Sequence, residues 1–295
     1  MTRFRGNGQK VTLVAVAALA LMLAACGPEE EEEPSVSSGA TPGGEQQCAV
    51  EDLSLVEPGR LTIATDKPAF EPWFRDNDPT NGEGFESAVA YAVAEELGFG
   101  EDDVEWVVEP FNKSYAPGPK NYDFDINQIS ITEKREQAVD FSDGYYDVNQ
   151  ALVAPAESPI AEVTSLQELA EFKLGAQVGT TSFAYIQTFI QPAEQPFTYD
   201  TTNDAKSALR AGQIDGIVVD LPTAFFISAV EIPGSAVVGQ FPTQDQNEQF
   251  GLLFEQGNPL VECVNEAIAA LKEDGTLDQI QDEWLSQAVD APVLE

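Results

Sequence analysis

Strand-like and helix-like segments alternate along this chain, and this alternation constrains its fold more than any other feature. A β-branched run at 60–66 predicts a strand, and apolar residues at helical spacing predict a helix over 84–98. Further strands are expected at 103–111 and 122–132, and the alternation starts again between 165 and 230. A repeated order of this kind predicts two α/β units with mostly parallel sheets. The 295 residues are enough for two domains of ordinary size.

Acidic residues dominate the charged positions of the chain. There are 51 Asp and Glu against 14 Lys and Arg, and the formal net charge is −37. Nucleic-acid binding depends on basic residues that neutralise phosphates, so no nucleic-acid partner is expected. The charge also disfavours direct contact with an anionic membrane surface. One hypothesis for the acidity is adaptation to high salt, which would screen the repulsion between carboxylates.

The first 25 residues have the layout of a secretory signal. Basic residues at positions 3, 5 and 10 precede an apolar run over 11–25 that is short for a bilayer span, although a membrane anchor is the alternative interpretation. The tetrapeptide LAAC at 23–26 resembles the bacterial lipoprotein lipobox. That resemblance implies cleavage before Cys26 and diacylglyceryl modification of its thiol. The mature protein would then be anchored to the extracytoplasmic side of the cell membrane.

Residues 26–49 are expected to form a flexible linker. Five successive glutamates at 29–33 repel one another, and Pro, Ser and Gly make up most of the remainder, so no core can form there. We interpret the segment as a tether, with cation binding by the glutamates as the alternative.

Two further cysteines are Cys48, at the end of the linker, and Cys263. In an exported protein an even pair favours one disulfide, which would join the start of the folded region to its last long helical segment. Two unpaired buried thiols are the alternative.

Polar residues collect at the predicted carboxyl ends of strands, where ligands bind in open α/β sheets. These positions are Asp66, residues 128–132, the GTTS turn at 179–182, and Asp220. All of them fall in loops or at strand ends rather than inside helices. They therefore predict a binding site at this edge of the sheets.

Several kinds of catalytic and metal site are excluded by residues that the chain lacks. It has no histidine, and no G-x-S-x-G elbow, Walker A loop or Rossmann glycine fingerprint. The DFDIN stretch at 123–127 looks like the start of an EF-hand loop, but Gln128 stands at its glycine position and Lys134 at its bidentate glutamate. We therefore expect no metal and no cofactor, and a binding protein rather than an enzyme.

The remaining polar groups match the two charged ends of an amino acid. Arg135 offers a planar fork for a carboxylate, and Ser130 or Thr132 could add a hydroxyl donor. Free N–H groups at the GTTS turn favour an anion, whereas Asp220 offers a negative partner for an ammonium. Each residue also has an ordinary interpretation: Arg135 on the surface, and Thr181 and Asp220 as helix caps.

The stretch ISITEKREQAVDFSDGYY at 129–146 resembles the family-3 solute-binding proteins of ABC importers, the group that binds polar amino acids. The segments TDKPAFEPW, GTTS, GQIDGIVVD and KEDGTLDQIQDEW support the resemblance, which extends from about residue 58 to 286. It implies capture of an amino acid and its delivery to a membrane permease by a monomeric, membrane-anchored binder.

The resemblance also implies a role for each candidate ligand-binding residue. Arg135 would hold the ligand carboxylate, together with Ser130 and the N–H of Thr181. The ammonium would meet Asp220, the carbonyl of Gln128 and the Ser130 hydroxyl. The remaining implied contacts are Asp66 near the amine or the side chain, and Phe70 and Phe111 as aromatic walls, with Trp73 behind them.

The implied architecture is a two-lobe periplasmic-binding-protein-like fold of type II. Each lobe would be a mixed, mostly parallel sheet flanked by helices, and two crossing strands would form a hinge. The first lobe would comprise residues 50–153 and 245–295, and the second lobe residues 154–244. The crossings are expected near 149–155 and 244–253.

Three departures from the family pattern bear on the ligand. Ala88 stands where the family often has Asp or Glu, and a Pro/Gly-rich loop over 114–125 replaces a regular helix and turn. Gln128 replaces a Gly or Ser, so its side chain is expected to reach the pocket. Rival functions are a cyclohexadienyl or arogenate dehydratase, which would need a carboxylic acid of raised pKa, and a sensory module.

Overall fold

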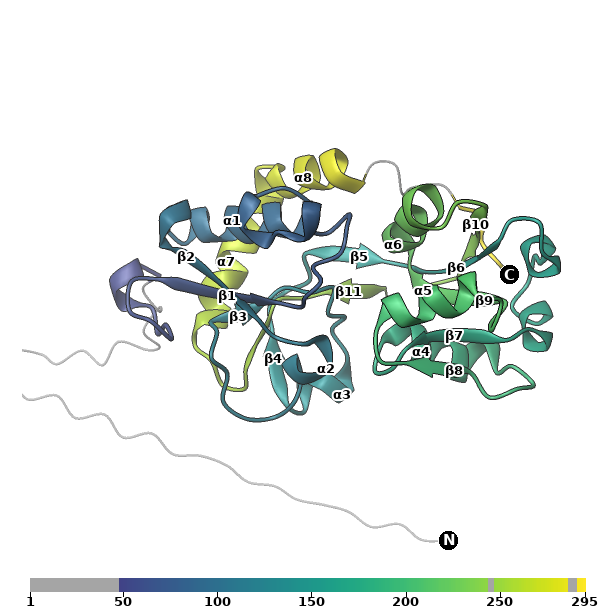
Figure 1. Cartoon of the computed structure of the whole chain (residues 1–295). Helices are drawn as coiled ribbons and strands as arrows, with labels where there is room; N and C mark the ends of the chain where they lie inside the picture. The colour runs from purple at the N-terminus through teal and green to yellow at the C-terminus, as the bar shows by residue number, and fades with distance from the viewer. Residues whose placement is uncertain (1–47, 244–246, 286–290) are drawn as a thin grey trace, which may run out of the picture. The chain divides into compact units, whose positions relative to one another are not determined.

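The computed structural model of the protein describes residues 48–243, 247–285 and 291–295. The predicted signal, the lipidation site at Cys26 and the linker up to residue 47 lie outside the described residues. Within them, two lobes each contain a five-stranded sheet (Figure 1). No helix in these ranges is both long enough and apolar enough to cross a bilayer.

The first lobe is built on a mixed sheet. Its strands, in spatial order, are β2 (Val104–Val108), β1 (Leu61–Thr65), β3 (Phe124–Asp125), β12 (Leu253–Glu255) and β4 (Val139–Phe141). The pairs β1–β2 and β1–β3 are parallel, whereas β12 runs antiparallel to both of its neighbours. The predicted strand at 122–132 is thus reduced to two residues, because the chain turns away from the sheet after Asp125.

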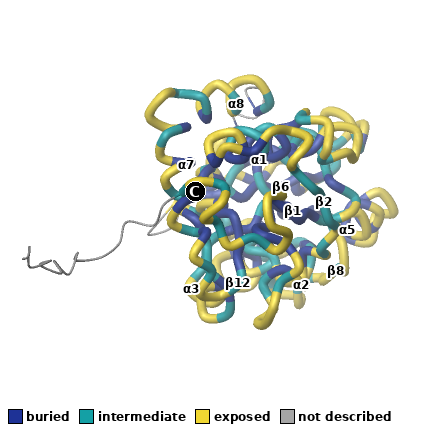
Figure 2. The backbone as a smooth tube through the Cα atoms, turned by 90° about the vertical axis from the view of Figure 1, so that its left-hand side faces the viewer, coloured by how far each residue is buried: buried dark blue, intermediate teal, exposed yellow. Residues whose placement is uncertain are grey.

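Helices cover both faces of the first sheet (Figure 1). On one side lie α1 (Phe85–Glu96), α7 (Leu260–Glu273) and α8 (Thr276–Leu285), and on the other α2 (Phe111–Ser114) and α3 (Glu133–Glu136). Val89 and Val93 of α1 share one fully buried cluster with Ile63 of β1 and Ile268 of α7. Figure 2 shows this interior as dark blue backbone beneath exposed outer turns.

Gly84 allows α1 to begin close to the loop that precedes it. Its φ is 95°, and a Cβ at this position would lie 2.7 Å from the Cα of Phe74. Glycine is therefore required on both conformational and steric grounds. The disulfide predicted from the sequence is present between Cys48 and Cys263, whose Cα atoms are 5.5 Å apart.

The second lobe has a sheet with the same balance of directions. Its order is β10 (Ser235–Gln240), β6 (Gln150–Pro155), β9 (Gly216–Asp220), β7 (Leu174–Gln177) and β8 (Phe197–Tyr199). The β10–β6 and β6–β9 pairs are antiparallel, and the β9–β7 and β7–β8 pairs are parallel. Each sheet therefore has two parallel and two antiparallel strand pairs, whereas the sequence predicts mostly parallel sheets. β6, which enters directly from the crossing between the lobes, accounts for both antiparallel pairs here.

Among the described residues, α-helices pack on both faces of the second sheet. Tyr185 and Ile186, at the end of α4 (Thr181–Tyr185), belong to the apolar cluster on one face. On the other face the cluster includes Leu209 of α5 (Thr202–Arg210) and Ala224 of α6 (Leu221–Phe226). The parallel strands β7 and β9 each lead directly into one of these helices, so their carboxyl ends open toward helix starts.

Two short strands connect the lobes. β5 (Tyr146–Val148) and β11 (Glu248–Phe250) pair antiparallel, with Glu248 opposite Val148. The predicted crossing at 244–253 contains β11. The predicted crossing at 149–155 coincides with β6, a strand of the second sheet, so the first lobe ends before 149 rather than at 153.

The last five residues correct the predicted lobe boundaries. Residues 245–295 are predicted to lie in the first lobe, but Leu294 belongs to an apolar cluster of the second lobe. Its N–H donates to the carbonyl of Gln240 at 2.9 Å, and Val293 forms a bridge with the same residue. The amphipathic pattern of the sequence predicts helix α8 correctly. It does not indicate that residues 291–295 pack on the second lobe.

Candidate ligand-binding site

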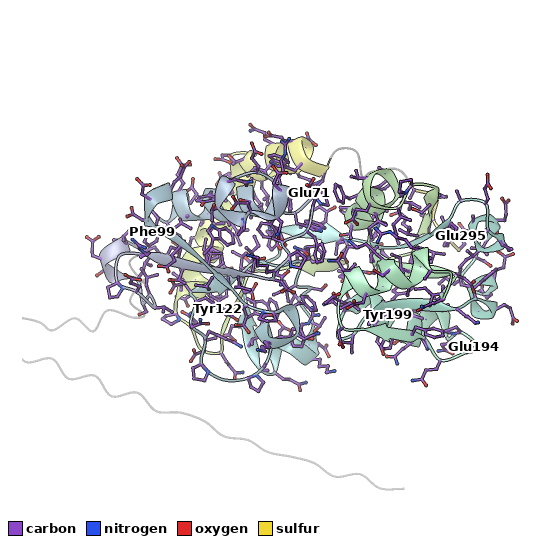
Figure 3. The ribbon with its side chains drawn as sticks, viewed as in Figure 1. Glu71, Phe99, Tyr122, Glu194, Tyr199 and Glu295 are labelled. Carbon is purple, nitrogen blue, oxygen red and sulfur yellow. A yellow bond between two sulfur atoms is a disulfide. The ribbon has the colours of Figure 1, made fainter. Side chains whose placement is uncertain are left out.

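A cavity of about 70 Å³ is lined by residues of both lobes. On this measure one water molecule needs about 10–15 Å³, so the cavity holds roughly five water-sized groups and suits a small molecule. Its lining comprises Asp66, Phe70, Glu71, Phe111, Asn127, Gln128, Gln177, Thr180, Thr181, Ser182, Thr202, Lys206, Val218, Val219, Asp220, Thr223 and Glu231. Figure 3 labels Glu71, which lies on the side of the first lobe nearest the second.

The strand ends place the predicted residues around this cavity. Asp66 follows β1, Gln128 follows β3, and Asp220 ends β9, while Thr181 begins α4 after β7. These four residues line the cavity, as do Phe70 and Phe111. Ser130 and Arg135 do not line it. They lie immediately behind, since the Ser130 hydroxyl is 3.3 Å from that of Thr181.

Arg135 is buried, with 7% of its surface exposed, so the surface interpretation is wrong. Its Nη1 donates to the carbonyl of Ser130 at 2.6 Å, and its Nη2 donates to the carbonyl of Gly179 in the second lobe at 3.1 Å. The guanidinium lies over the rings of Phe111 and Tyr115, 5.4 and 4.9 Å from their centroids. Burial lowers the pKa of Arg135 from its ordinary value. A buried, aromatic-clamped guanidinium is well oriented for a planar carboxylate.

The structure also rejects the two capping interpretations. Thr180, rather than Thr181, caps α4, because its hydroxyl accepts the N–H of Phe183 at 3.1 Å. Asp220 precedes α6 without a side-chain cap. Its Oδ1 instead accepts the side-chain amide of Gln150 at 2.7 Å. The side chains of Thr181 and Asp220 thus serve the cavity rather than the helix ends.

Asp220 lies in an environment that disfavours its negative charge. Burial raises its pKa to about 8, and the nearby carboxylates of Glu248 and Glu86 act in the same direction. The Gln150 hydrogen bond and the positive charge of Arg135 oppose the rise but do not cancel it. A cation that reached this carboxylate would therefore restore its ionised form.

Gln128 is held by a buried glutamate that sequence reasoning missed. Its backbone N–H donates to Oε1 of Glu86 at 2.7 Å, and its side-chain amide donates to the other oxygen. Tyr145 also donates to Glu86, which is fully buried and has a pKa raised to about 7 by burial. Gln128 lines the cavity, but its amide is directed to Glu86. The sequence feature that could have revealed Glu86 is its position on the same helical stripe as Ala90 and Val93.

Lys206 is a second residue that sequence reasoning missed. It is only 2% exposed, and its Nζ lies 2.7 and 2.8 Å from the two carboxylate oxygens of Glu231. The same ammonium is 4.9 Å from the ring centroid of Phe70, in the other lobe. A further link between the lobes joins Trp73 Nε1 to the Thr223 hydroxyl at 2.9 Å. The available signal for Lys206 was its place between Ala205 and Leu209 on the apolar side of α5.

The lining of the cavity is acidic overall. Lys206 is the one basic residue in the lining, against four acidic residues: Asp66, Glu71, Asp220 and Glu231. No group of three or more acidic or thiol side chains in the described ranges is arranged to hold a metal ion. The arrangement suits a small organic ligand that carries a positive charge.

Comparisons with known proteins agree with this geometry. The family model described as "Bacterial extracellular solute-binding proteins, family 3" matches residues 61–287. The chain is 28% identical to the ABC transporter glutamine-binding protein of Bacillus subtilis (strain 168), over 71% of this chain and 76% of that protein. It is also 28% identical to the L-arginine-binding protein of Pseudomonas aeruginosa, over 76% and 90% of the two chains.

Solved structures show the same fold. An ancestral arginine-binding protein bound to arginine is 30% identical, with a TM-score of 0.65 over 77% of this chain and 98% of that one. An ancestral amino acid-binding protein described as a precursor of cyclohexadienyl dehydratase is 27% identical, with a TM-score of 0.63 over 77% and 95%. The family match covers most of the chain, and the fold agrees with it. This chain therefore belongs to the family-3 bacterial extracellular solute-binding proteins.

Proposed function

We propose that this protein captures an amino acid between its lobes and delivers it to the membrane permease of an ABC importer. The observation that carries the proposal is the position of a buried arginine, Arg135, immediately behind a small cavity that the carboxylate of Asp220 lines. A ligand with a carboxylate and an ammonium a few ångströms apart satisfies both groups. Relatives named as glutamine- and arginine-binding proteins support the same ligand class.

The carboxylate end of the ligand belongs near Arg135 and the start of α4. Two of the five N–H donors of Arg135 are used by the carbonyls of Ser130 and Gly179, so others remain for a ligand. The backbone N–H of Thr181, the first residue of α4, adds a further donor.

The ammonium end belongs near Asp220, with the carbonyl of Gln128 and the Ser130 oxygen as neutral acceptors. The ligand side chain would then lie between Phe70, Phe111 and Asp66. Because the lining is acidic, cationic and neutral polar amino acids should bind more tightly than aspartate or glutamate.

The family is extracellular, and the lipobox-like LAAC would keep the binder at the membrane through a lipid on Cys26. We further propose that the protein acts as a monomer, since one chain supplies both walls of the cavity.

A thermal-shift screen of the chain from residue 27 onward against the twenty amino acids tests the proposal. A ligand at 100 times its Kd stabilises the folded state by about 2.7 kcal/mol. A shift with at least one amino acid is expected. Shifts with only a sugar, a peptide or a metal ion would contradict the proposal.

One observation favours a second function. A carboxylic acid that keeps its proton near neutral pH is what a dehydratase uses as general acid, and the pKa of Asp220 is about 8. One neighbour in the structure comparison is also described as the precursor of such an enzyme. Conversion of prephenate or arogenate by the purified chain would establish this alternative, and we expect none.

A further inference from the structure

We infer that Glu248, on the hinge strand β11, is a positioning residue for the ligand ammonium. It makes the Ser130 hydroxyl a hydrogen-bond acceptor, and it shares the side-chain amide donor of Gln150 with Asp220. The inference deepens the proposed function and rests on it, because it concerns how an amino group is recognised at the same site.

The first observation is the direction of one hydrogen bond. Ser130 Oγ donates to Glu248 Oε1 at 2.6 Å, and a hydroxyl has only one proton to donate. The 3.3 Å contact between the hydroxyls of Ser130 and Thr181 is therefore donated by Thr181. Ser130 is left able only to accept further hydrogen bonds. It can receive an N–H of an ammonium, but it cannot help Arg135 to bind a carboxylate.

The second observation concerns Gln150, which is 97% buried at the start of β6. Its Oε1 accepts the Ser182 hydroxyl at 2.6 Å, which fixes the orientation of the amide. Its Nε2 then lies 2.7 Å from Oδ1 of Asp220, and 3.2 and 3.1 Å from the two oxygens of Glu248. One neutral amide thus bridges two carboxylates.

When Asp220 is ionised, the charges around this bridge do not balance. Asp220 and Glu248 face each other. The other titratable groups that face one of them are Glu86, Arg135, Tyr145 and Tyr146. Arg135 is the only cation among these groups, and its guanidinium donates to the carbonyls of Ser130 and Gly179 rather than to either carboxylate. Carboxylates that share a site favour a cation between them. The ammonium of an amino acid supplies that charge at the place where Ser130 accepts.

The third observation is the position of Glu248 in the chain. It pairs with Val148 in the two-stranded connection between the lobes. Its carboxylate contacts Ser130, which belongs to the first lobe, and Gln150, which belongs to the second. A positive charge beside Asp220 therefore lies near Glu248, a residue of the hinge strand that contacts both lobes.

Titration calorimetry with ligands that differ only in the α-amino group tests this inference. The probes are L-arginine with 5-guanidinopentanoic acid, and L-glutamine with glutaramic acid, since arginine and glutamine occupy solved structures of a similar protein. The variant is Glu248→Gln. Glu273→Gln, on the exposed side of α7, makes the same change of formal charge away from the site.

Glu248→Gln should weaken binding of the amino acid roughly tenfold to a hundredfold, because a hydrogen bond to a charged group is altered. Its effect on the affinity for the analogue without the amino group should stay within about twofold. Glu273→Gln should change the affinity for neither ligand. The affinity of the wild type should rise with pH up to about 8, where Asp220 ionises. In Glu248→Gln this rise should move to lower pH, because one neighbouring negative charge is gone.

Equal loss of affinity for the amino acid and its analogue, or an unmoved pH profile, would overturn the inference and leave the proposed function intact. Failure of the wild type to bind any of the twenty amino acids would overturn both. If Glu248→Gln does not fold, Ser130→Ala removes the other partner of the 2.6 Å bond. It should give the same selective loss for ligands with an amino group, and an unselective loss would contradict the inference.

Discussion

Arg135 in the first lobe donates a hydrogen bond to the carbonyl of Gly179 in the second, at 3.1 Å. This contact places the guanidinium beside the start of α4, where the N–H of Thr181 also lies. The same arginine therefore takes part in the approach of the lobes and in the proposed grip on the ligand carboxylate. Loss of its side chain should affect both.

Arg135→Ala should weaken amino acid binding by about 2–5 kcal/mol, a loss of roughly thirtyfold or more, because a buried charged donor is removed. Arg135→Lys should restore little of it, since an ammonium cannot reproduce the planar fork between two rings. Arg60→Ala is the matched control, because Arg60 pairs with Glu105 on the surface, with side chains 45% and 44% exposed. Calorimetry that found Arg135→Ala no weaker than Arg60→Ala would contradict the assignment.

Gly179→Ala should hinder closure of the lobes. A Cβ on Gly179 would overlap the Tyr115 hydroxyl of the other lobe and lie 2.8 Å from Asn112 Oδ1. Gly212→Ala separates this effect from backbone strain, because Gly212 also has positive φ (67°) but no atom within 4 Å of a Cβ. We expect Gly179→Ala to lower amino acid affinity roughly tenfold, which corresponds to about 1.4 kcal/mol of binding free energy. Gly212→Ala should leave the affinity unchanged. Equal effects of the two substitutions would rule out the closure argument.

Six of the eight predicted ligand residues line the cavity. Four of them, Asp66, Gln128, Thr181 and Asp220, could be found because periodicity shows where strands end and parallel strands bring their carboxyl ends to one edge. Phe70 and Phe111 were expected only from the family resemblance. Glu86, Gln150 and Glu248 were not predicted. Each acts through a partner that is distant in sequence: Glu86 accepts from Gln128, Gln150 donates to Asp220, and Glu248 accepts from Ser130 and Gln150. A buried charge in an apolar stripe is visible in a sequence, but its partner is set by tertiary contacts. The packing of Leu294 on the second lobe was hidden for the same reason.

The pH dependence of stability should follow from Asp220. Its pKa of about 8 in the folded protein lies above the ordinary value of 3.8, so the folded state holds this proton more tightly than the unfolded state. The free energy of unfolding without ligand should therefore fall as pH rises from about 4 to about 8. Glu86, with a pKa of about 7, contributes a slope of the same sign.

Asp220→Asn should reduce that slope without abolishing it, because Glu86 still titrates. Asp102→Asn, at an exposed position, serves as the control and should leave the slope unchanged. Urea unfolding at several pH values between 4 and 8 measures the effect. A slope in Asp220→Asn as steep as in the wild type would show that Asp220 is ionised throughout this range.

Replacement of both Cys48 and Cys263 by serine should lower stability but not ligand affinity. The bond closes a loop of 215 residues and lies in the first lobe, away from the cavity. On the chain-entropy model its removal costs about 5 kcal/mol, and removal of native disulfides typically costs about 2–5 kcal/mol. Urea unfolding should show this loss while calorimetry shows unchanged binding. A loss below about 1 kcal/mol would contradict the expectation.

The most direct test of the central claim is calorimetric titration of the chain from residue 27 onward with each of the twenty amino acids. Wild type, Arg135→Ala and Asp220→Asn should be compared side by side. Our account predicts that at least one amino acid binds the wild type with one molecule per chain, and that each substitution lowers its affinity at least roughly tenfold. Binding of no amino acid, or binding of the same amino acid with unchanged affinity by both variants, would contradict it.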